Sequence, residues 1–192
     1  MVSKIYFAGG CFWCTEAIFT RVEGVEKVLP GYIGGHLKNP SYKEVCSGRT
    51  GHAEAVLVEF NDKIISLEKL LLIFFQIHDP TQLNRQGNDI GTQYRSAIFY
   101  TNQKHKEFIE IIINKLSKSI FNKKNIVTIV ELAKDFYIAE KEHLNYFNLN
   151  SNKPYCQLVI SPKIQKLKEI IFSVLYIFFV ISITFVSKIF II

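Results

Sequence analysis

The sequence predicts a single α/β domain in which a mixed sheet is flanked by helices. The 192 residues are 48% hydrophobic, which is enough for one sizeable core. Hydrophobic side chains alternate over residues 53–60, as in a half-buried strand, and recur every fourth residue over 108–120, as in an amphipathic helix. Strand-like and helix-like segments of this kind follow one another along the chain, and no linker separates two domains.

Local signals predict the individual elements in order. Residues 5–8 are an apolar run typical of a strand, and Gly9-Gly10 predicts a turn into a helix over about 12–21. Ser66 is typical of a helix N-cap, and Pro80 requires that this helix end before it. The remaining predicted elements are strands at 53–60, 94–100, 126–130 and 157–160 and helices at 108–120 and 132–146.

Charge is unevenly distributed along the chain. There are 23 Lys and Arg against 17 Asp and Glu, a net charge of +6, and residues 1–101 hold ten of each sign. The basic residues of the second half are not interleaved with aromatic residues around the glycine-rich loops, as a nucleic-acid interface would require. We therefore expect a solvated basic face and no nucleic-acid partner.

Both the start of the chain and its cysteine content indicate the compartment. Met1–Lys4 lead directly into the first predicted strand, without the long apolar core of a secretory signal. Four Cys in 192 residues are too few for a disulfide-dense secreted scaffold. We expect a cytoplasmic protein, in which neighbouring cysteines indicate redox chemistry or metal binding.

The C-terminal residues differ from the rest of the chain. Residues 170–187 carry no charge, and 14 of these 18 are Ile, Val, Leu, Phe or Tyr. As a helix they would span about 27 Å, the lower limit for a hydrocarbon core of ~30 Å. A membrane anchor at the inner face of the membrane, a buried terminal helix and a non-native tail all remain open as interpretations.

The first chemical motif is GCFWC, in which Cys11 and Cys14 lie one helical turn apart. A thiol that follows a strand and a Gly-Gly turn is expected at a helix N-terminus, where the helix dipole favours the thiolate. A zinc site would need a second cysteine pair, whereas Cys46 and Cys156 each stand alone. A general dithiol–disulfide motif remains an alternative, although Phe and Trp between the cysteines are more typical of an apolar pocket wall.

Two further motifs follow, YKEVCSGRTGHAE and HDPTQLNRQGNDIGTQYRS. Glu54 ends the first, near the start of the strand predicted at 53–60. If its side chain lies on the buried face, the pKa of the carboxyl is raised, which suits a general acid. The second motif is a polar loop, and we expect His78, Asn84 and Arg85 to have structural roles there.

These three motifs resemble the A-class peptide methionine sulfoxide reductases, over about residues 4–167. The resemblance implies a ferredoxin-like two-layer sandwich for residues 1–167, with residues 168–192 as an appended apolar C-terminal helix. It implies reduction of L-methionine (S)-sulfoxide, in oxidised proteins and as the free amino acid, by a monomer recycled by thioredoxin. Enzymes of this class restore oxidised methionine. No metal or organic cofactor is implied.

The resemblance also assigns roles to residues. Cys11 corresponds to the nucleophile, which passes through a sulfenic acid, and Glu54 to the acid that protonates the departing oxygen. Either Cys14 or Cys156 is the resolving thiol, and Cys46 is expected in the core. The other assigned residues are Tyr42, Tyr94 and Asp89 as hydrogen-bonding partners of the reacting groups, and Phe12 and Trp13 as the pocket for the substrate methyl group.

One stretch departs from the family pattern. Residues 139–146 read AEKEHLNY, so that His143 and Tyr146 are retained while Glu142 replaces an aromatic residue and Leu144 an amide. This departure concerns packing at the rim of the site and leaves the assigned catalytic residues intact. A membrane-tethered module that binds oxidised methionine without catalysis is the alternative from another functional class.

Overall fold

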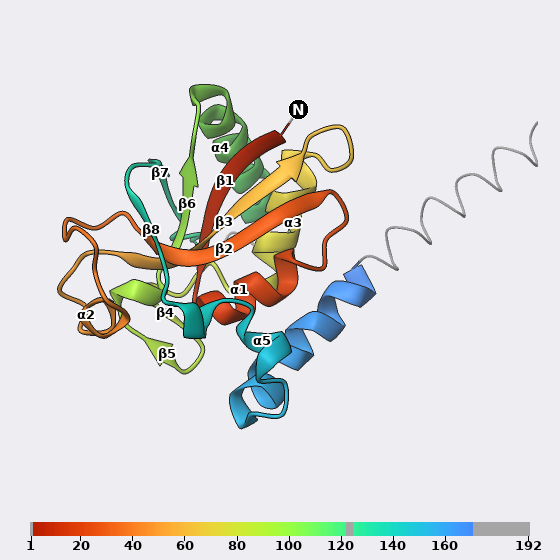
Figure 1. Ribbon diagram of the computed structural model, residues 1–192. Coiled ribbons are helices and arrows are strands. Elements are labelled where there is room, and N and C mark those ends of the chain that lie inside the picture. The colour runs from red at the N-terminus through yellow and green to blue at the C-terminus, as the bar shows by residue number, and fades with distance from the viewer. Residues whose placement is uncertain (1, 122–124, 171–192) are drawn as a thin grey trace, which may run out of the picture.

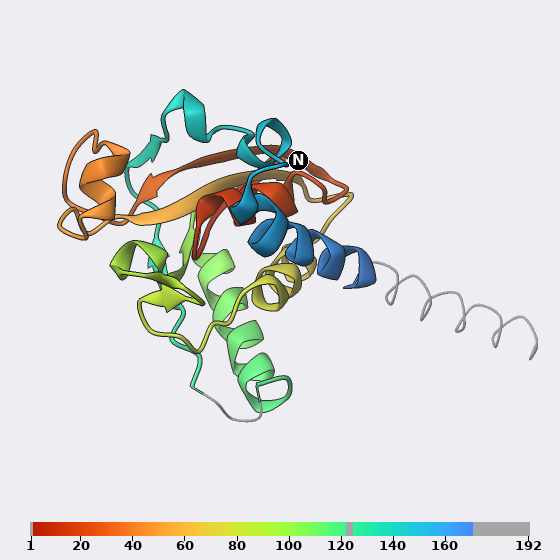
Figure 2. The ribbon, with the colours of Figure 1, turned by 90° about the horizontal axis from the view of Figure 1, so that it is seen from below.

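The computed structural model describes residues 2–121 and 125–170. One layer is a six-stranded mixed sheet, and helices pack on one face of it (Figures 1 and 2). The strands of this sheet are β1 (Val2–Gly9), β2 (Val25–Ile33), β3 (Ala53–Asn61), β6 (Ser96–Tyr100), β7 (Ile129–Leu132) and β8 (Phe136–Ile138). The helices are α1 (Phe12–Phe19), α2 (Tyr42–Cys46), α3 (Leu67–Ile77), α4 (Gln103–Lys118) and α5 (Tyr146–Leu149), and residues 154–170 are also helical.

The strand order of the sheet is β7-β6-β1-β3-β2-β8. Neighbouring strands are antiparallel except β6 and β7, which are parallel. Among the elements of the two layers, β1, α1, β2, β3, α3 and β6 follow one another in the sequence, with α2 between β2 and β3 and the β4–β5 hairpin between α3 and β6. In the sheet, β3 lies between β1 and β2. A separate hairpin of β4 (Arg85–Gln86) and β5 (Asp89–Ile90) stands beside the sheet.

The sheet is curled at one end. Strands β7 and β8 lie at its opposite edges, yet only residues 133–135 connect them. In a flat sheet five strand spacings would separate these edges by about 24 Å, whereas this connection reaches about 14 Å. The two edges must therefore approach each other, and the curled face encloses a small second core that includes Ala55, Ala97 and Phe99.

The main core lies between the sheet and the helices. Helix α1 is buried nearly all round, with seven of its eight residues inaccessible, which explains its lack of a polar face. Phe7 of β1 stacks between Phe19 of α1 and Phe74 of α3, at ring distances of 4.9 and 4.8 Å. This aromatic contact fixes both helices on the sheet close to the GCFWC turn.

Several predicted elements are confirmed. The strands predicted at 5–8 and 53–60 correspond to β1 and β3, and the helix predicted at 12–21 corresponds to α1. Ser66 caps α3, since its hydroxyl accepts a hydrogen bond from the Lys69 N–H at 3.2 Å. The strand predicted from residue 94 begins at Ser96, after a 3₁₀ turn, and the helix predicted at 108–120 is α4.

Other predictions were wrong. The helix predicted at 132–146 is instead occupied by the end of β7, by β8 and by short turns, because this segment pairs with β2 and closes the curled sheet. The strand predicted at 126–130 begins later, at Ile129. Strand β2 and helix α2 were not predicted at all.

The strand predicted at 157–160 is also wrong, because these residues form a π-helical turn, Cys156–Ile160, in the C-terminal helix. Cys156, Ile160, Ile164 and Leu167 are all buried in the main core. Their spacing of four, four and three places one helical face against the domain. The short apolar run at 157–160 suggested a strand, whereas the helical spacing of buried residues becomes visible only over 156–167.

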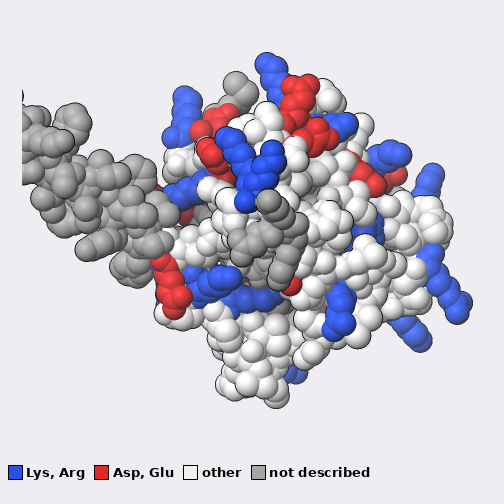
Figure 3. All heavy atoms as spheres, turned by 180° about the vertical axis from the view of Figure 1, so that it is seen from behind, with Lys and Arg blue, Asp and Glu red and all other residues white. Residues whose placement is uncertain are grey.

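The apolar stretch at 170–187 lies, after its first residue, outside the described part of the chain. Within residues 2–121 and 125–170, no helix combines the length and apolar character needed to cross a membrane. Figure 3 shows Lys and Arg spread over the face opposite that of Figure 1, with Asp and Glu among them. On this face the basic side chains form no continuous stripe.

Candidate active site

Cys11 lies at the junction of β1 and α1. Gly10 adopts a φ of +88°, and a Cβ added there would meet the Gln86 side chain at 2.7 Å, so only glycine fits this turn. The turn makes Cys11 the N-cap of α1, as the sequence predicts. The residue is only 7% exposed and belongs to the main core.

Glu54 approaches the same helix end from β3. Its Oε2 accepts a hydrogen bond from the Phe12 N–H at 3.1 Å, and so satisfies one of the free amides at the start of α1. The carboxyl is 1% exposed, and its Oε1 has no hydrogen-bond partner among the described residues. Burial raises the pKa of Glu54 to about 8, so the group is protonated at neutral pH.

The two thiols of the GCFWC motif form an interacting pair. Burial raises the pKa of Cys11, and its hydrogen bond with Cys14 raises it further. A hydrogen bond from Cys11 lowers the pKa of Cys14 to about 7. The two sulfurs share this hydrogen bond, so they titrate as one pair, and the thiolate that forms near neutral pH is held between them.

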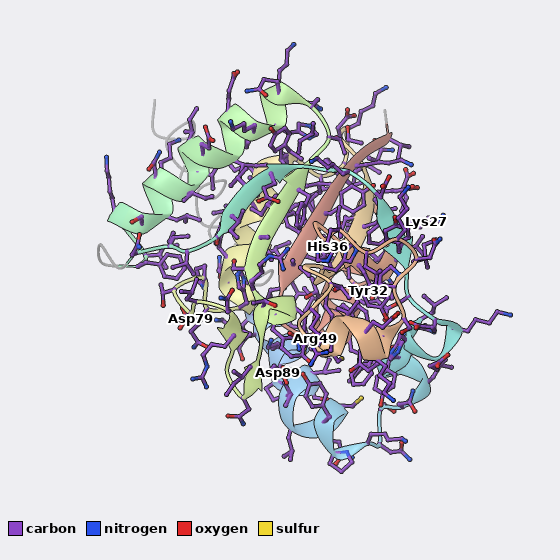
Figure 4. All side chains as sticks on the ribbon, turned by 90° about the vertical axis from the view of Figure 1, so that its left-hand side faces the viewer. Lys27, Tyr32, His36, Arg49, Asp79 and Asp89 are labelled. Atoms are coloured by element: carbon purple, nitrogen blue, oxygen red, sulfur yellow. The ribbon has the colours of Figure 1, made fainter. Side chains whose placement is uncertain are left out.

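Tyr155 joins the C-terminal helix to this pair. Its hydroxyl lies 3.9 Å from the Cys14 Sγ and donates a hydrogen bond to Asp89 Oδ2 at 2.9 Å. Figure 4 shows Asp89 where the β4–β5 hairpin meets that helix. Asp89 therefore lies beside the thiol pair, and Tyr155, which no sequence motif indicated, connects them.

Tyr42 and Tyr94 belong to the same region. Burial raises the pKa of both phenols, and the nearby Glu54 charge raises it further. Both hydroxyls are therefore neutral and able to donate hydrogen bonds near Glu54. Tyr32 of β2, labelled in Figure 4, was missed, and its hydroxyl donates to Glu140 Oε2 at 2.7 Å.

An aromatic cluster forms the wall of the site. Trp13 stacks on Tyr146 at 3.7 Å with nearly parallel rings, and its Nε1 donates a hydrogen bond to His143 Nδ1 at 3.2 Å. Phe12 contacts the rings of Tyr42 and His143 at 6.3 and 5.4 Å. Phe12 is buried while Trp13 is half-buried, so Trp13 offers the accessible part of this wall.

The departure from the family pattern falls outside this cluster. Glu142, which replaces an aromatic residue, is exposed, whereas the retained His143 is buried. Glu140 of the same run accepts a hydrogen bond from the Tyr42 N–H at 2.7 Å. The substitution therefore leaves the contacts of the site intact.

The other two cysteines lie in different surroundings. Cys156 is fully buried, one residue after Tyr155, and the Cys14 charge contributes to the raised pKa of its thiol after burial itself. Cys46 is half-buried and absent from the core clusters, so its predicted core position is wrong. It ends the short helix α2, and its thiol interacts with the Tyr42 hydroxyl.

The polar loop at 78–96 has the predicted structural contacts. His78 Nδ1 lies 2.6 Å from the Phe74 carbonyl and its Nε2 lies 2.8 Å from Ser96 Oγ. Burial lowers the pKa of His78 to about 4, which keeps the ring neutral. Asn84 adopts a left-handed φ of 50°, and Arg85 donates to the Gly87 carbonyl. Among the residues with described positions, no group of three His, Cys, Asp or Glu side chains is arranged to hold a metal ion.

Comparison with known sequences identifies the family. A model of the family described as peptide methionine sulfoxide reductase matches residues 3–174. The peptide methionine sulfoxide reductase MsrA of Nautilia profundicola is 50% identical over 167 residues, which cover 87% of this chain and 95% of the relative. The MsrA of Vesicomyosocius okutanii is 54% identical over 161 residues, or 84% and 95% of the two chains.

Solved structures agree with these matches. Mxr1 from Saccharomyces cerevisiae in reduced form has a TM-score of 0.76 at 36% identity, over 81% of this chain and 89% of that chain. Mxr1 in complex with Trx2 has a TM-score of 0.54 at 26% identity, over 76% and 84% of the two chains. The chain therefore belongs to the peptide methionine sulfoxide reductase family, A class.

Proposed function

We propose that this protein reduces L-methionine (S)-sulfoxide, in oxidised proteins and as the free amino acid, with Cys11 as the nucleophile and Glu54 as the acid. One observation carries the assignment of roles. A protonated carboxyl is buried against the backbone of the residue that follows Cys11, and one of its oxygens is unpartnered among the described residues. Such a group can donate a proton to a sulfoxide oxygen that points toward it.

In the first step, the sulfur of Cys11 attacks the sulfur of the sulfoxide as a thiolate. Glu54 gives its proton to the sulfoxide oxygen, and the neutral phenols of Tyr42 and Tyr94 hold that oxygen by hydrogen bonds. The protonated oxygen then transfers from the substrate sulfur to the Cys11 sulfur, the sulfur–oxygen bond of the substrate and the new sulfur–sulfur bond both break, and a sulfenic acid on Cys11 and methionine result. The substrate sulfur gains the two electrons that Cys11 loses.

In the second step, a thiol condenses with the sulfenic acid, and a disulfide and one water molecule form. Cys14 is the first candidate, since it already interacts with Cys11. Cys156 follows Tyr155, which lies 3.9 Å from the Cys14 sulfur, and it is the candidate for a second exchange. Asp89 and Tyr155 support the proton transfers of this step.

Thioredoxin restores the thiols. Its dithiol supplies two electrons and two protons, so that the net reaction converts sulfoxide and reduced thioredoxin into thioether, oxidised thioredoxin and water. The structure of the yeast relative with Trx2 supports this partner. We propose that Trp13 and Phe12 take the substrate methyl group, because an aromatic wall without charge suits it.

Substitutions at two positions test this function. In Cys11→Ser we expect no turnover of N-acetyl-methionine (S)-sulfoxide, and in Glu54→Gln a loss of about 10²–10⁴-fold in kcat. Glu59→Gln, at the other end of β3 from Glu54 and paired with Lys4, is the control and should keep full activity. Full sulfoxide turnover in Cys11→Ser would overturn the assignment, and an unaffected Glu54→Gln would instead favour a general dithiol–disulfide oxidoreductase that uses Cys11 and Cys14.

The strand order β6-β1-β3-β2 with crossings by α1 and α3 supports a ferredoxin-like two-layer sandwich. We propose that residues 1–167 form this reductase domain, active as a cytoplasmic monomer, and that residues 168–192 are an appended apolar segment. The family match ends at residue 174, before most of that segment. Membrane fractionation of the full chain against one that stops at Lys168 distinguishes an anchor, which sediments the full chain alone, from a tail without membrane affinity.

A further inference from the structure

Glu16 is a buried carboxylate that the reaction above does not use. It lies on α1, two residues after Cys14, and is only 4% exposed. Its Oε1 accepts a hydrogen bond from the Asn145 N–H at 2.7 Å, and its Oε2 accepts one from the Tyr146 N–H at 3.2 Å. A buried carboxylate is costly unless it is hydrogen-bonded, so these two amides account for its place in the core.

The segment that Glu16 holds also forms the aromatic wall. Tyr146 stacks on Trp13, and His143 accepts the hydrogen bond of the indole. Trp13 lies three residues before Glu16 on the same helix, and so about one turn away on the same face. Helix α1 thus contacts this segment through the rings of Phe12 and Trp13 and through the carboxylate of Glu16.

Beyond the contacts of Glu16, Arg21 holds the outer side of this segment, since it donates a hydrogen bond to Asn148 Oδ1 at 2.6 Å and lies over the Phe147 ring. Helix α5 has four residues, none of them buried, and its N-cap Asn145 adopts a left-handed φ of 54°. At the other end, Glu140 fixes the segment through the Tyr32 hydroxyl and the Tyr42 N–H. Two carboxylates therefore hold the two ends of residues 140–146, and Glu16 holds the end that carries Tyr146.

We propose that Glu16 is a positioning residue for substrate binding, which acts through Tyr146 and His143 to hold the Trp13 indole in the pocket wall. This inference rests on the proposed function, because it assigns Trp13 to the sulfoxide pocket. Glu16 itself contacts neither the thiols nor the substrate, so its loss should weaken binding and leave the chemical step largely intact.

The isosteric variant Glu16→Gln tests whether Glu16 affects substrate binding and not the chemical step. Its amide can accept only one of the two N–H groups and presents its own NH₂ to the other. We expect KM for N-acetyl-methionine (S)-sulfoxide to rise about tenfold and kcat to change less than about threefold. Glu59→Gln is the control and should leave KM unchanged, since Glu59 pairs with Lys4 at 2.9 Å, at the end of β3 that lies away from Glu54.

A spectroscopic measurement follows the same contact without turnover. Trp13 is the only tryptophan of the chain, so intrinsic fluorescence reports on this wall alone. In Glu16→Gln we expect the emission to shift to longer wavelength, because the indole loses its stacked partner and meets water. Titration in a Cys11→Ser background should show binding of the sulfoxide weakened by about the same factor as KM.

A double-mutant cycle tests whether Glu16 acts through Tyr146. Tyr146→Leu should raise KM as Glu16→Gln does, and the double variant should be no more than about threefold worse than either. Wild-type KM and emission in Glu16→Gln would overturn the proposal, as would a loss confined to kcat or fully additive effects. If the wild-type protein fails to reduce the sulfoxide, the proposed function fails, while Trp13 emission still decides the role of Glu16.

Discussion

The hydrogen bond from the Phe12 amide to Glu54 joins two residues that lie 42 positions apart in the sequence. It places a buried carboxyl beside the buried thiol pair. The same burial that keeps Glu54 protonated also raises the pKa of Cys11, so one environment acts on both groups. Desolvation therefore acts on both the thiol and the carboxyl of the site.

This pairing predicts a bell-shaped dependence of kcat/KM on pH. Activity should rise as the thiol pair loses its first proton, with a pKa of about 7, and fall as Glu54 loses its proton, with a pKa of about 8. Steady-state rates from pH 5.5 to 9.5 measure both limbs. In Glu54→Gln the residual activity should keep the acid limb and lose the alkaline one, and an alkaline limb that persists would assign it to another group.

Glu54 also predicts how stability depends on pH. Its pKa is raised on folding, from about 4.3 in the unfolded chain to about 8, so the folded state binds the proton more tightly. The contribution of this proton is complete below about pH 4.3, and it is lost as pH rises toward 8, by up to about 1.4 kcal/mol per pH unit.

Urea unfolding at pH 5 and pH 8 measures this effect. Between these values the wild type should lose more of its free energy of unfolding than Glu54→Gln, which has no proton to release at this position. Glu59→Gln serves as the control for a carboxyl near the surface, since its partner Lys4 is half-exposed. Equal pH dependence in all three proteins would show that Glu54 ionises normally in the fold.

At the scale of elements, the site is assembled where four segments converge. The β1–α1 turn brings the thiols, β3 brings Glu54, the β4–β5 hairpin brings Asp89, and the C-terminal helix brings Tyr155 and Cys156. The hydrogen bond between Asp89 and Tyr155 links the hairpin to this helix. The same Tyr155 hydroxyl lies 3.9 Å from the Cys14 sulfur, so this contact influences the surroundings of Cys14.

Tyr155→Phe tests the link between these two elements. The Tyr155 hydroxyl helps to lower the pKa of Cys14, after the larger effect of Cys11, so its removal should leave less thiolate at neutral pH. We expect alkylation of Cys14 by iodoacetamide at pH 7 to slow about threefold, as followed by mass spectrometry. Tyr137→Phe, whose ring packs on His52, should react at the wild-type rate. An unslowed Tyr155→Phe would remove this hydroxyl from the thiol environment.

At the scale of the whole molecule, stability depends on the core between the sheet and the helices. Phe74 is fully buried and packs on Phe7, Phe75 and His78. Phe74→Ala should lower the free energy of unfolding by about 3–5 kcal/mol, because it leaves a cavity between α3 and β1. Urea denaturation measures the loss, and Phe147→Ala, at a half-buried position, should cost less. Equal costs would contradict the role of this core contact.

Much of this architecture could be predicted from local signals. The GCFWC turn, the strand that carries Glu54 and the cap at Ser66 each depend on residues close together in the sequence, and all three are confirmed. Residues 132–146 and 157–160 were assigned the wrong element, because their short apolar patterns fit more than one structure. Pairing with β2 decides the first segment, and packing against α1 decides the second.

The sequence by itself determined the family, the thiol at the start of α1 and the carboxyl of Glu54. Each of these depends on a motif of contiguous residues. Only the tertiary structure decided which groups are charged and which side chains hold them. Folding encloses the Cys11–Cys14 pair in a buried site, leaves Cys46 half-buried outside the core, and brings Tyr155 and Glu16 into contact with distant segments. The physical reason is that desolvation and long-range hydrogen bonds depend on neighbours in space, which no local pattern of residues specifies.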